Sequence, residues 1–274
     1  MKNIKKISYI KEDSLVNDIY IVSNVNKLKE IINKPFICVG NMSKTICGYN
    51  LLNTNIIKSE IKDVYIEKGI IKVGSGILLS ELDNLLINKN IKNFNMLRTI
   101  PGTIGGAISM NASFLNESIS ENLLAIEGID NENKYKKIDI DKLIFSYRKS
   151  NIKDILKMIT YAYFKPIYSS RNEIKQRINK AYEYRLKQPK IRYTLGSTFK
   201  NHLNFKAYEI ISKINKTEYK TFKIDDKHKN FLNFYPNSKG YEIRNDLLSL
   251  KNNIIKETGI CLDFEINFLY DLSK

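Results

Sequence analysis

The sequence predicts an α+β protein of two or three lobes, and three observations on its 274 residues support this class. Short β-branched runs alternate with turn residues through the first half of the chain, which indicates strands. Longer segments with apolar residues at helical spacing lie mainly in the second half. The hydrophobic fraction of 43% is ordinary for a globular protein, so the chain can bury a substantial core.

Strands are expected at three places in the first half. Residues 36–39 (FICV) form a buried strand that ends at Gly40, and residues 70–73 (IIKV) form another that ends at a second glycine turn. Residues 125–140 form a hairpin around the polar turn 130–133.

Helices are expected between and after these strands. One follows the strand at 70–73, with Ser80 as its N-cap and an apolar face made of Leu82, Leu85 and Leu86. A polar helix runs from about 170 to 188 and stops before Pro189, and a short helix spans 205–214.

The C-terminal region combines one helix with one strand. The helix is capped by Asn245 or Asp246, ends at Gly259, and carries Leu247, Leu250, Ile254 and Ile255 on its apolar face. In the strand that follows, Ile260, Leu262, Phe264, Ile266 and Phe268 alternate with Cys261, Asp263, Glu265 and Asn267. We therefore expect Glu265 to point toward solvent or a cleft.

A stretch at 165–172 (KPIYSSRN) that contains proline and serine marks a domain boundary. We predict one domain over residues 1–166, in two lobes of about 1–68 and 69–166. A smaller α+β domain follows over residues 167–274.

The net charge of +16 at first suggests a nucleic-acid partner. Only seven of the 45 basic residues are Arg, however, and the lysines are scattered without a basic block of five or six. Abundant Lys, Ile, Asn and Tyr are the pattern of AT-rich codons. We therefore expect no nucleic-acid function; the positive field equally suits an anionic small molecule, which it concentrates.

Cysteine and histidine are too few and too scattered for a metal site. Cys38, Cys47 and Cys261 form no CxxC pair, and His202 and His228 are the only imidazoles. We expect reduced, mostly buried thiols and no metal. The N-terminal segment lacks the apolar stretch of a secretory signal, and no run approaches a membrane span. We expect a cytoplasmic protein without membrane insertion and without an obligate protein partner.

Residues 100–111 (IPGTIGGAISMN) hold the only concentration of glycine in the chain. Three glycines within five residues leave the backbone bare, so a ligand can approach N–H groups that together bind anions. Pro101 fixes the entry angle, and Thr103 and Asn111 offer side-chain hydrogen bonds. The spacing is not that of a Rossmann dinucleotide loop. From composition alone, an anion-binding loop and a tight structural turn are equally supported.

Five segments, in this order, resemble the motifs of one enzyme family. They are PGTIGGAISMN at 101–111, FSYRKS at 145–150, RLKQP with GSTFKN at 185–201, DKHKNFLN at 226–233 and GICLDFEI at 259–266. The chain resembles the UDP-N-acetylenolpyruvoylglucosamine reductase family, whose motifs include GIPGTxGGAxxMNAG, YRxS, GSxFKN and HxNFxN. Within that family it is similar to the second, shorter type.

The resemblance implies a two-lobed FAD-binding domain of the vanillyl-alcohol-oxidase/PCMH type over residues 1–166, followed by a substrate-binding domain over 167–274. It also implies non-covalent FAD, NADPH as co-substrate, and reduction of UDP-N-acetylenolpyruvoylglucosamine to UDP-N-acetylmuramate for peptidoglycan. In that reaction NADPH reduces FAD, which then passes hydride to the enolpyruvyl double bond. The negative charge that develops requires a cation and a proton donor.

By the same resemblance, three residues are catalytic. Arg148 holds the substrate carboxylate, Ser197 donates the proton, and Glu265 is the acidic partner near the reacting carbon. Lys187 and Asn201 contact the diphosphate region of the substrate. A permanently charged guanidinium suits a carboxylate, which it can bind through two parallel hydrogen bonds.

The implied flavin-binding residues lie in two loops. These are Gly40, Asn41, Met42, Ser43 and Lys44 in the first loop, and Pro101, Gly102, Thr103, Gly105, Gly106 and Asn111 in the second. The first loop usually reads GGGSN in the family. Asn41 tolerates positive φ, whereas Met42 is expected to crowd the flavin pyrophosphate.

Two other interpretations stay open at this point. One is another flavin-dependent oxidoreductase with the same flavin domain; since no His precedes His202, a covalent flavin would need Cys38 or Cys47. The other is a flavin-free basic binding protein descended from the reductase.

Overall fold

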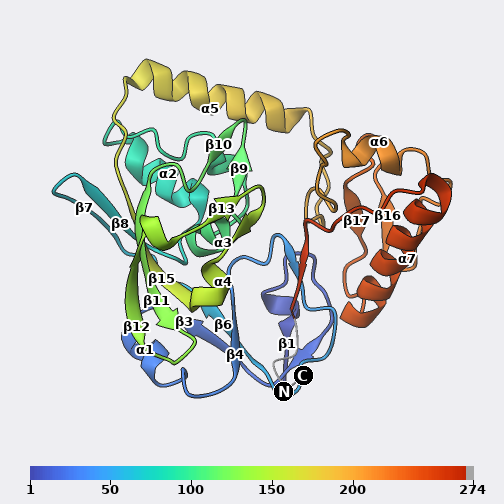
Figure 1. Cartoon of the computed structure of the whole chain (residues 1–274), viewed down its shortest axis with the longest axis horizontal. Helices are drawn as coiled ribbons and strands as arrows, with labels where there is room; N and C mark the ends of the chain where they lie inside the picture. Colours follow the sequence, from blue (N-terminus) through green and yellow to red (C-terminus); the bar gives the residue numbers. More distant parts are fainter. Residues whose placement is uncertain (270–274) are drawn as a thin grey trace. The chain divides into compact units, whose positions relative to one another are not determined.

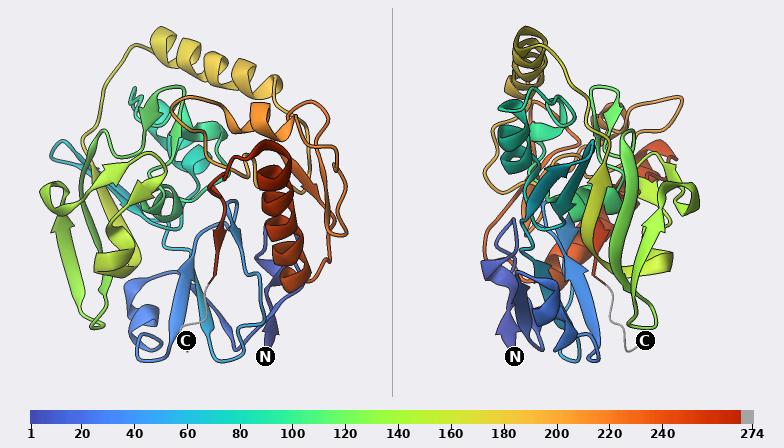
Figure 2. Two further views of the ribbon diagram at one scale, coloured as in Figure 1. Left: turned by 45° about the vertical axis from the view of Figure 1, so that its right-hand side comes forward. Right: turned by 90° about the vertical axis from the view of Figure 1, so that its left-hand side faces the viewer.

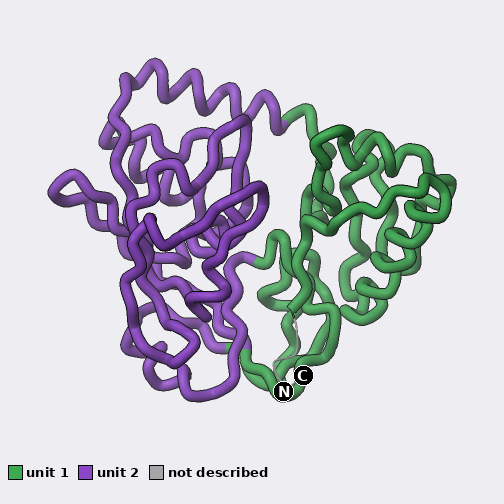
Figure 3. The backbone as a smooth tube through the Cα atoms, in the orientation of Figure 1, with its two compact units in different colours: residues 1–19, 42–55, 186–274 green, residues 20–41, 56–185 purple. Residues whose placement is uncertain are grey.

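The computed structural model describes residues 1–269, and the backbone divides into two compact units (Figure 3). Unit 1 comprises residues 1–19, 42–55 and 186–274, and unit 2 comprises residues 20–41 and 56–185. The domains predicted above divide the chain by cofactor and substrate, and that division stays a prediction. The compact units are divided differently, because two N-terminal segments join the C-terminal third in unit 1.

Unit 2 is built on a five-stranded sheet in which all neighbours are antiparallel (Figure 1). Its order is β12 (Tyr135–Asp139), β11 (Leu123–Asp130), β15 (Leu156–Phe164), β8 (Ile70–Gly74) and β7 (Val64–Glu67). One face is fully buried in the core through side chains such as Ile71, Ile126 and Phe164. These residues alternate along their strands with the polar residues of the other face.

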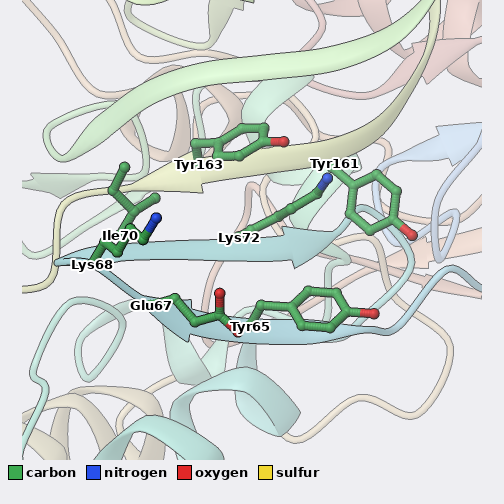
Figure 4. Close-up of a pocket in the computed structure, with 7 residues that line it drawn as sticks. All are labelled: Tyr65, Glu67, Lys68, Ile70, Lys72, Tyr161 and Tyr163. Atoms are coloured by element: carbon green, nitrogen blue, oxygen red, sulfur yellow. The ribbon is translucent and has the colours of Figure 1, made fainter.

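The polar face of this sheet carries a groove (Figure 4). Lys72 Nζ lies 4.4 Å from the ring centroid of Tyr161 and 5.3 Å from that of Tyr163. Glu127 is 3.4 Å from Lys72 Nζ and accepts a hydrogen bond of 2.5 Å from Tyr163. The groups on this face therefore satisfy one another.

The remaining elements of unit 2 surround the large sheet. A second sheet has the order β3 (Ile19–Val22), β6 (Asn55–Ser59) and β4 (Phe36–Val39). The helices are α1 (Val25–Lys29), α2 (Leu79–Ile87), η2 (Leu97–Thr99), α3 (Ile104–Ser109), η3 (Ile140–Lys142), α4 (Ile152–Ile155) and α5 (Arg171–Leu186). Two small hairpins are β9 (Ser113–Phe114) with β10 (Glu117–Ser118) and β13 (Phe145–Ser146) with β14 (Lys149–Ser150). In both Figure 1 and Figure 2, α5 runs past α2 and the β9–β10 hairpin.

Unit 1 has its own hydrophobic core. It contains α6 (Ala207–Ile211), the hairpin of β16 (Phe222–Ile224) and β17 (Leu232–Phe234), and α7 (Gly240–Thr258). Its N-terminal part is β1 (Lys2–Asn3), η1 (Ile4–Lys6) and β2 (Leu15–Val16), and β5 (Thr45–Ile46) pairs in parallel with β18 (Asn267–Phe268). The core joins Ile10 and Ile46 to Phe199, Leu247 and Ile266.

Most predicted elements are confirmed, with three corrections. Ser80 lies inside α2 rather than at its N-cap, and Leu85 is 50% exposed. The last helix begins at Gly240, ahead of Asn245, although Gly259 ends it with φ +71° as expected. The final alternating segment is a strand only at Asn267–Phe268, yet its apolar residues do pack into the unit 1 core.

No helix within residues 1–269 combines the length and the apolar character needed to cross a membrane.

Candidate active site

Gly40 and Asn41, which begin the first predicted cofactor loop, contact the second loop within unit 2. Asn41 Nδ2 donates to the carbonyl of Pro101 at 2.9 Å. A Cβ at Gly40 would lie 2.5 Å from Thr103 Oγ1, so this approach requires glycine. A Cβ at Gly106 would meet nothing closer than 3.4 Å, so packing within the protein does not require glycine there. The bare backbone at Gly106 leaves room for a ligand.

The N–H groups of the second loop are used inside the protein, which corrects the expectation that they are free to bind an anion. Gly102 N donates to Ile100 O at 2.8 Å, and Ile104 N donates to Ile77 O at 3.0 Å. Gly105 N donates to Ser75 O at 2.9 Å, and Gly106 N donates to Thr103 Oγ1 at 3.4 Å. The loop is thereby fixed against the turn that follows β8. It offers a surface without side chains rather than a row of free donors.

The first loop keeps free donors. Met42 has φ +49°, and within residues 1–269 the N–H groups of Met42 and Ser43 make no hydrogen bond. Neighbouring N–H groups beside a left-handed residue can form an anion-binding concavity. The Met42 side chain is only 2% exposed, so it is directed into the protein. This burial argues against the hypothesis that Met42 crowds the flavin pyrophosphate, which stays a prediction.

Arg148 lies at the turn of the β13–β14 hairpin in unit 2. Its φ of +55° is unusual for a residue with a side chain, and such strain concentrates at functional sites. Its Nη1 donates to Ser113 Oγ at 2.5 Å. Asn111 Nδ2 donates to Ser146 O at 3.0 Å, and Asn111 Oδ1 accepts from Ser120 at 2.8 Å. Asn111, predicted to bind the cofactor, thus holds the hairpin that carries Arg148.

Ser197 lies in a turn of unit 1 that Asn230 holds in place. Asn230 is 3% exposed, and its Oδ1 accepts from Thr198 N at 3.1 Å and from Phe199 N at 2.9 Å. Its Nδ2 donates to Phe199 O at 2.8 Å. Gly196 has φ +67°, a conformation that favours glycine. Among the described residues the Ser197 hydroxyl has no hydrogen-bond partner, so it is available to a ligand.

Glu265 and Lys44 form an ion pair next to this turn. Lys44 Nζ lies 2.9 Å from Glu265 Oε1 and donates to Ser197 O at 2.5 Å. Glu265 N donates to Thr198 O at 2.8 Å. Glu265 is 6% exposed, so it does not point to solvent, contrary to one of the expectations from the sequence. We call Ser197, Lys44 and Glu265 the serine cluster.

The two predicted substrate-binding residues are also in unit 1. Lys187 is exposed just after α5. Asn201 Oδ1 accepts from Ala207 N at 3.0 Å at the start of α6, so its Nδ2 is the part of the amide left for a ligand. Within residues 1–269 no hydrogen bond or ion pair joins either side chain to the serine cluster.

The thiols near the N-terminal half are unreactive. Burial raises the pKa of Cys38 to about 12. Burial, with the nearby Glu12 carboxylate, also raises the pKa of Cys47 to about 12. A thiol acts as a nucleophile through its thiolate, which both residues lack at neutral pH. Neither cysteine is suited to a covalent link with flavin.

The fold and the matches along the chain define a class of protein. Residues 20–138 match the family described as "FAD binding domain". A solved structure of UDP-N-acetylenolpyruvylglucosamine reductase from Thermus caldophilus shares the fold, with a TM-score of 0.84 at 23% identity over 98% of each chain. The chain thus contains an FAD-binding domain within an α+β fold, as predicted.

Two curated relatives narrow the class to one family. A protein from Pelagibacter ubique is 31% identical over 229 residues, which cover 81% of this chain and 72% of the relative. A protein from Aquifex aeolicus is 30% identical over 274 aligned residues, which cover 96% of this chain and 89% of the relative. Both are named UDP-N-acetylenolpyruvoylglucosamine reductase. This chain belongs to the UDP-N-acetylenolpyruvoylglucosamine reductase family.

The residues matched to the family fall into two groups, one in each unit. Unit 1 brings Ser197, Glu265 and Lys44 together, whereas Arg148 and most of the glycine backbone belong to unit 2. The sequence missed Asn230, although this residue lies within the DKHKNFLN segment that resembled the family. It also gave no sign of the contact between Lys44 and Glu265, because this contact joins distant parts of the chain; the assignment of Lys44 to the cofactor stays a prediction.

Proposed function

We propose that the chain reduces UDP-N-acetylenolpyruvoylglucosamine to UDP-N-acetylmuramate with NADPH, through bound FAD, in the synthesis of peptidoglycan precursors. The observation that carries the proposal is the serine cluster in a member of this family. The cluster holds a buried carboxylate next to a serine whose hydroxyl has no partner among residues 1–269. Arg148, the third matched residue, projects from a strained turn.

The residues present fit FAD. The bare backbone at Gly106 suits close approach of a flat or extended group, and Met42 N–H and Ser43 N–H suit a phosphate. FAD, when bound, accepts hydride from NADPH and delivers it to the enolpyruvyl double bond. The raised pKa values of the thiols support non-covalent binding, in which flavin leaves the protein on denaturation.

The side chains of the chain complete the reduction. Arg148 holds the substrate carboxylate and offsets the negative charge that develops as hydride adds to the double bond. Ser197 gives its hydroxyl proton to the other carbon, and water returns a proton to the serine oxygen. Glu265 acts as the acidic partner at that carbon. Lys187 and Asn201 Nδ2 contact the diphosphate of the substrate.

The positive net charge of +16 supports this set of ligands, because the UDP-sugar, NADPH and FAD are all anionic. We propose that the protein works in the cytoplasm on these small molecules, without nucleic acid or an obligate protein partner. Cell fractionation and gel filtration of the native protein test this.

The direct test separates the two half-reactions by anaerobic stopped-flow absorbance of the flavin. Ser197→Ala should leave reduction by NADPH nearly intact and slow reoxidation by the enolpyruvyl substrate at least about 10²-fold, since a general acid contributes about 10²–10⁴-fold. Ser212→Ala, at the exposed serine that caps the C-terminus of α6, is the matched control. Arg148→Ala should slow the same step and weaken substrate binding, and Glu265→Gln should slow it with little effect on folding.

The outcomes discriminate clearly. Wild-type reoxidation rates in all three variants, or a wild-type protein that cannot be reoxidised by this substrate, would refute the proposed reaction. If Ser197→Ala instead blocks reduction by NADPH, only the role of that serine is withdrawn.

A further inference from the structure

We propose that Lys44 is a positioning residue that fixes the Ser197 turn and the Glu265 carboxylate relative to each other. The first-loop motif had suggested a cofactor ligand instead. The inference rests on the proposed function, because it concerns the residues of the same reaction.

A single ammonium group joins two segments that are far apart in the sequence. Lys44 Nζ is 2.9 Å from Glu265 Oε1 and 2.5 Å from Ser197 O. Both contacts are charge-assisted, which makes them shorter and stronger than neutral hydrogen bonds. The ammonium therefore links the acid and the serine turn directly.

The backbone of Lys44 is anchored on the same side as Glu265. Lys44 O accepts from Asn267 N at 2.8 Å, and Thr45 pairs with Asn267 in the parallel β5–β18 ladder. The side chain thus begins beside the segment that carries Glu265 and β18, and it ends at the Ser197 turn.

Gly196 sets the conformation of the Ser197 turn. Its φ of +67° favours glycine. A Cβ at this position would make only an ordinary van der Waals contact with Lys44 Nζ, at 3.6 Å. Glycine is therefore required by the backbone conformation and not by the approach of the ammonium.

Burial increases the cost of breaking the ion pair between Lys44 and Glu265. Glu265 is 6% exposed, and the side chain of Lys44 is 24% exposed. Lys44→Met would remove the positive charge that lies 2.9 Å from this buried carboxylate, and breaking a buried ion pair is strongly destabilising, so the carboxylate should leave its position. Misplacement of a reacting group by about 1 Å can cost about 10²-fold in rate. Loss of Lys44 should therefore affect the step that uses Ser197 and Glu265.

The experiment compares Lys44→Met, Lys44→Arg and Glu265→Gln in the FAD-loaded enzyme, with Lys256→Met, at an exposed lysine of α7, as the matched control. Lys44→Met should slow flavin reoxidation by the substrate at least about tenfold. Reduction by NADPH and the Kd for FAD should stay within about twofold of the wild type, because neither depends on the serine cluster. Lys44→Arg should restore part of the rate, since a guanidinium also pairs with a carboxylate.

A double-mutant cycle tests the route of the effect. Lys44→Met combined with Glu265→Gln should be about as slow as the slower single variant, because both changes break the same pair. If Lys44→Met instead weakens FAD binding or slows reduction by NADPH while reoxidation is unchanged, Lys44 is a cofactor ligand and the inference is overturned.

A second measurement does not depend on activity. Hydrogen exchange of the same protein should show faster exchange at the amides of Thr198, Phe199 and Glu265 in Lys44→Met, and not in Lys256→Met. Unchanged exchange at these three amides would overturn the positioning role even if the substrate assignment holds. A wild-type enzyme that fails to use the substrate would refute the proposed function and leave this measurement to decide on Lys44.

Discussion

Asn230→Ala would show how the serine turn is built. The Asn230 amide makes three hydrogen bonds to the segment 198–199 and is 3% exposed. After truncation Thr198 N still has the backbone carbonyl of residue 230 as acceptor at 2.8 Å, but Phe199 N and Phe199 O lose their partner. A buried group without a partner costs about 1–3 kcal/mol, so two such groups should lower the unfolding free energy by about 2–6 kcal/mol.

Urea unfolding followed by circular dichroism measures this loss. Asn204→Ala, at an exposed asparagine of unit 1, is the control and should stay within about 0.5 kcal/mol of the wild type. Asn230→Asp keeps an acceptor for Phe199 N and lacks the donor for Phe199 O. Its unfolding free energy should therefore lie between those of Asn230→Ala and Asn204→Ala. A loss below about 0.5 kcal/mol in Asn230→Ala would refute the argument that this amide supports the turn.

Two further predictions follow from buried side chains. Met42→Gly removes a side chain that is 2% exposed, which should lower the unfolding free energy by about 2–5 kcal/mol. Relief of the strained backbone at φ +49° should recover about 1 kcal/mol of this loss. The melting temperature should fall and FAD titration should show no tighter binding; tighter binding at unchanged stability would contradict this. Burial, opposed by Arg98 at 2.7 Å, raises the pKa of Asp83 to about 6. The folded-state pKa lies above the unfolded value of 3.8, so the folded protein binds more protons than the unfolded chain between these two values. As the pH rises from about 4 to about 6, the unfolding free energy of the wild type should therefore fall by up to about 3 kcal/mol relative to that of Asp83→Asn. Parallel pH profiles of these two proteins would contradict the assigned pKa.

Local patterns were sufficient for much of the fold. The buried strand at 36–39, the hairpin around 130–133 and the left-handed stop at Gly259 all depend on a few neighbouring residues. Ser80 and Asp246 show where local patterns fail. The N–H of Leu78 at the start of α2 is bound by Glu81, and Asp246 accepts from Thr221 N and Oγ1, both at 2.8 Å. A good capping residue is therefore used elsewhere when a tertiary partner is available.

The candidate site divides in the same way. The motifs located Arg148, Ser197 and Glu265, and the proposed roles of all three still depend on that resemblance. The partners of these residues could not be found, because Lys44, Ser113 and Asn230 reach them across long stretches of sequence. The same holds for the second glycine loop, whose donors are bound by Ser75 and other residues near the end of β8. Spacing within a motif carries no information about such contacts.

The division of the chain into units determines the order in which its parts can fold during synthesis. Translation releases the N-terminus first, yet residues 1–19 and 42–55 share a core with residues 186–274, which appear last. Ile10 and Ile46 therefore cannot be buried in their core until residues 186–274 have been made. Unit 2, in contrast, can complete its sheet as soon as β15 has left the ribosome. Pairings between such distant segments form slowly, and apolar residues that wait are open to aggregation. The nascent chain thus exposes both glycine-containing loops, at 40–44 and 100–111, well before it exposes Ser197 and Glu265.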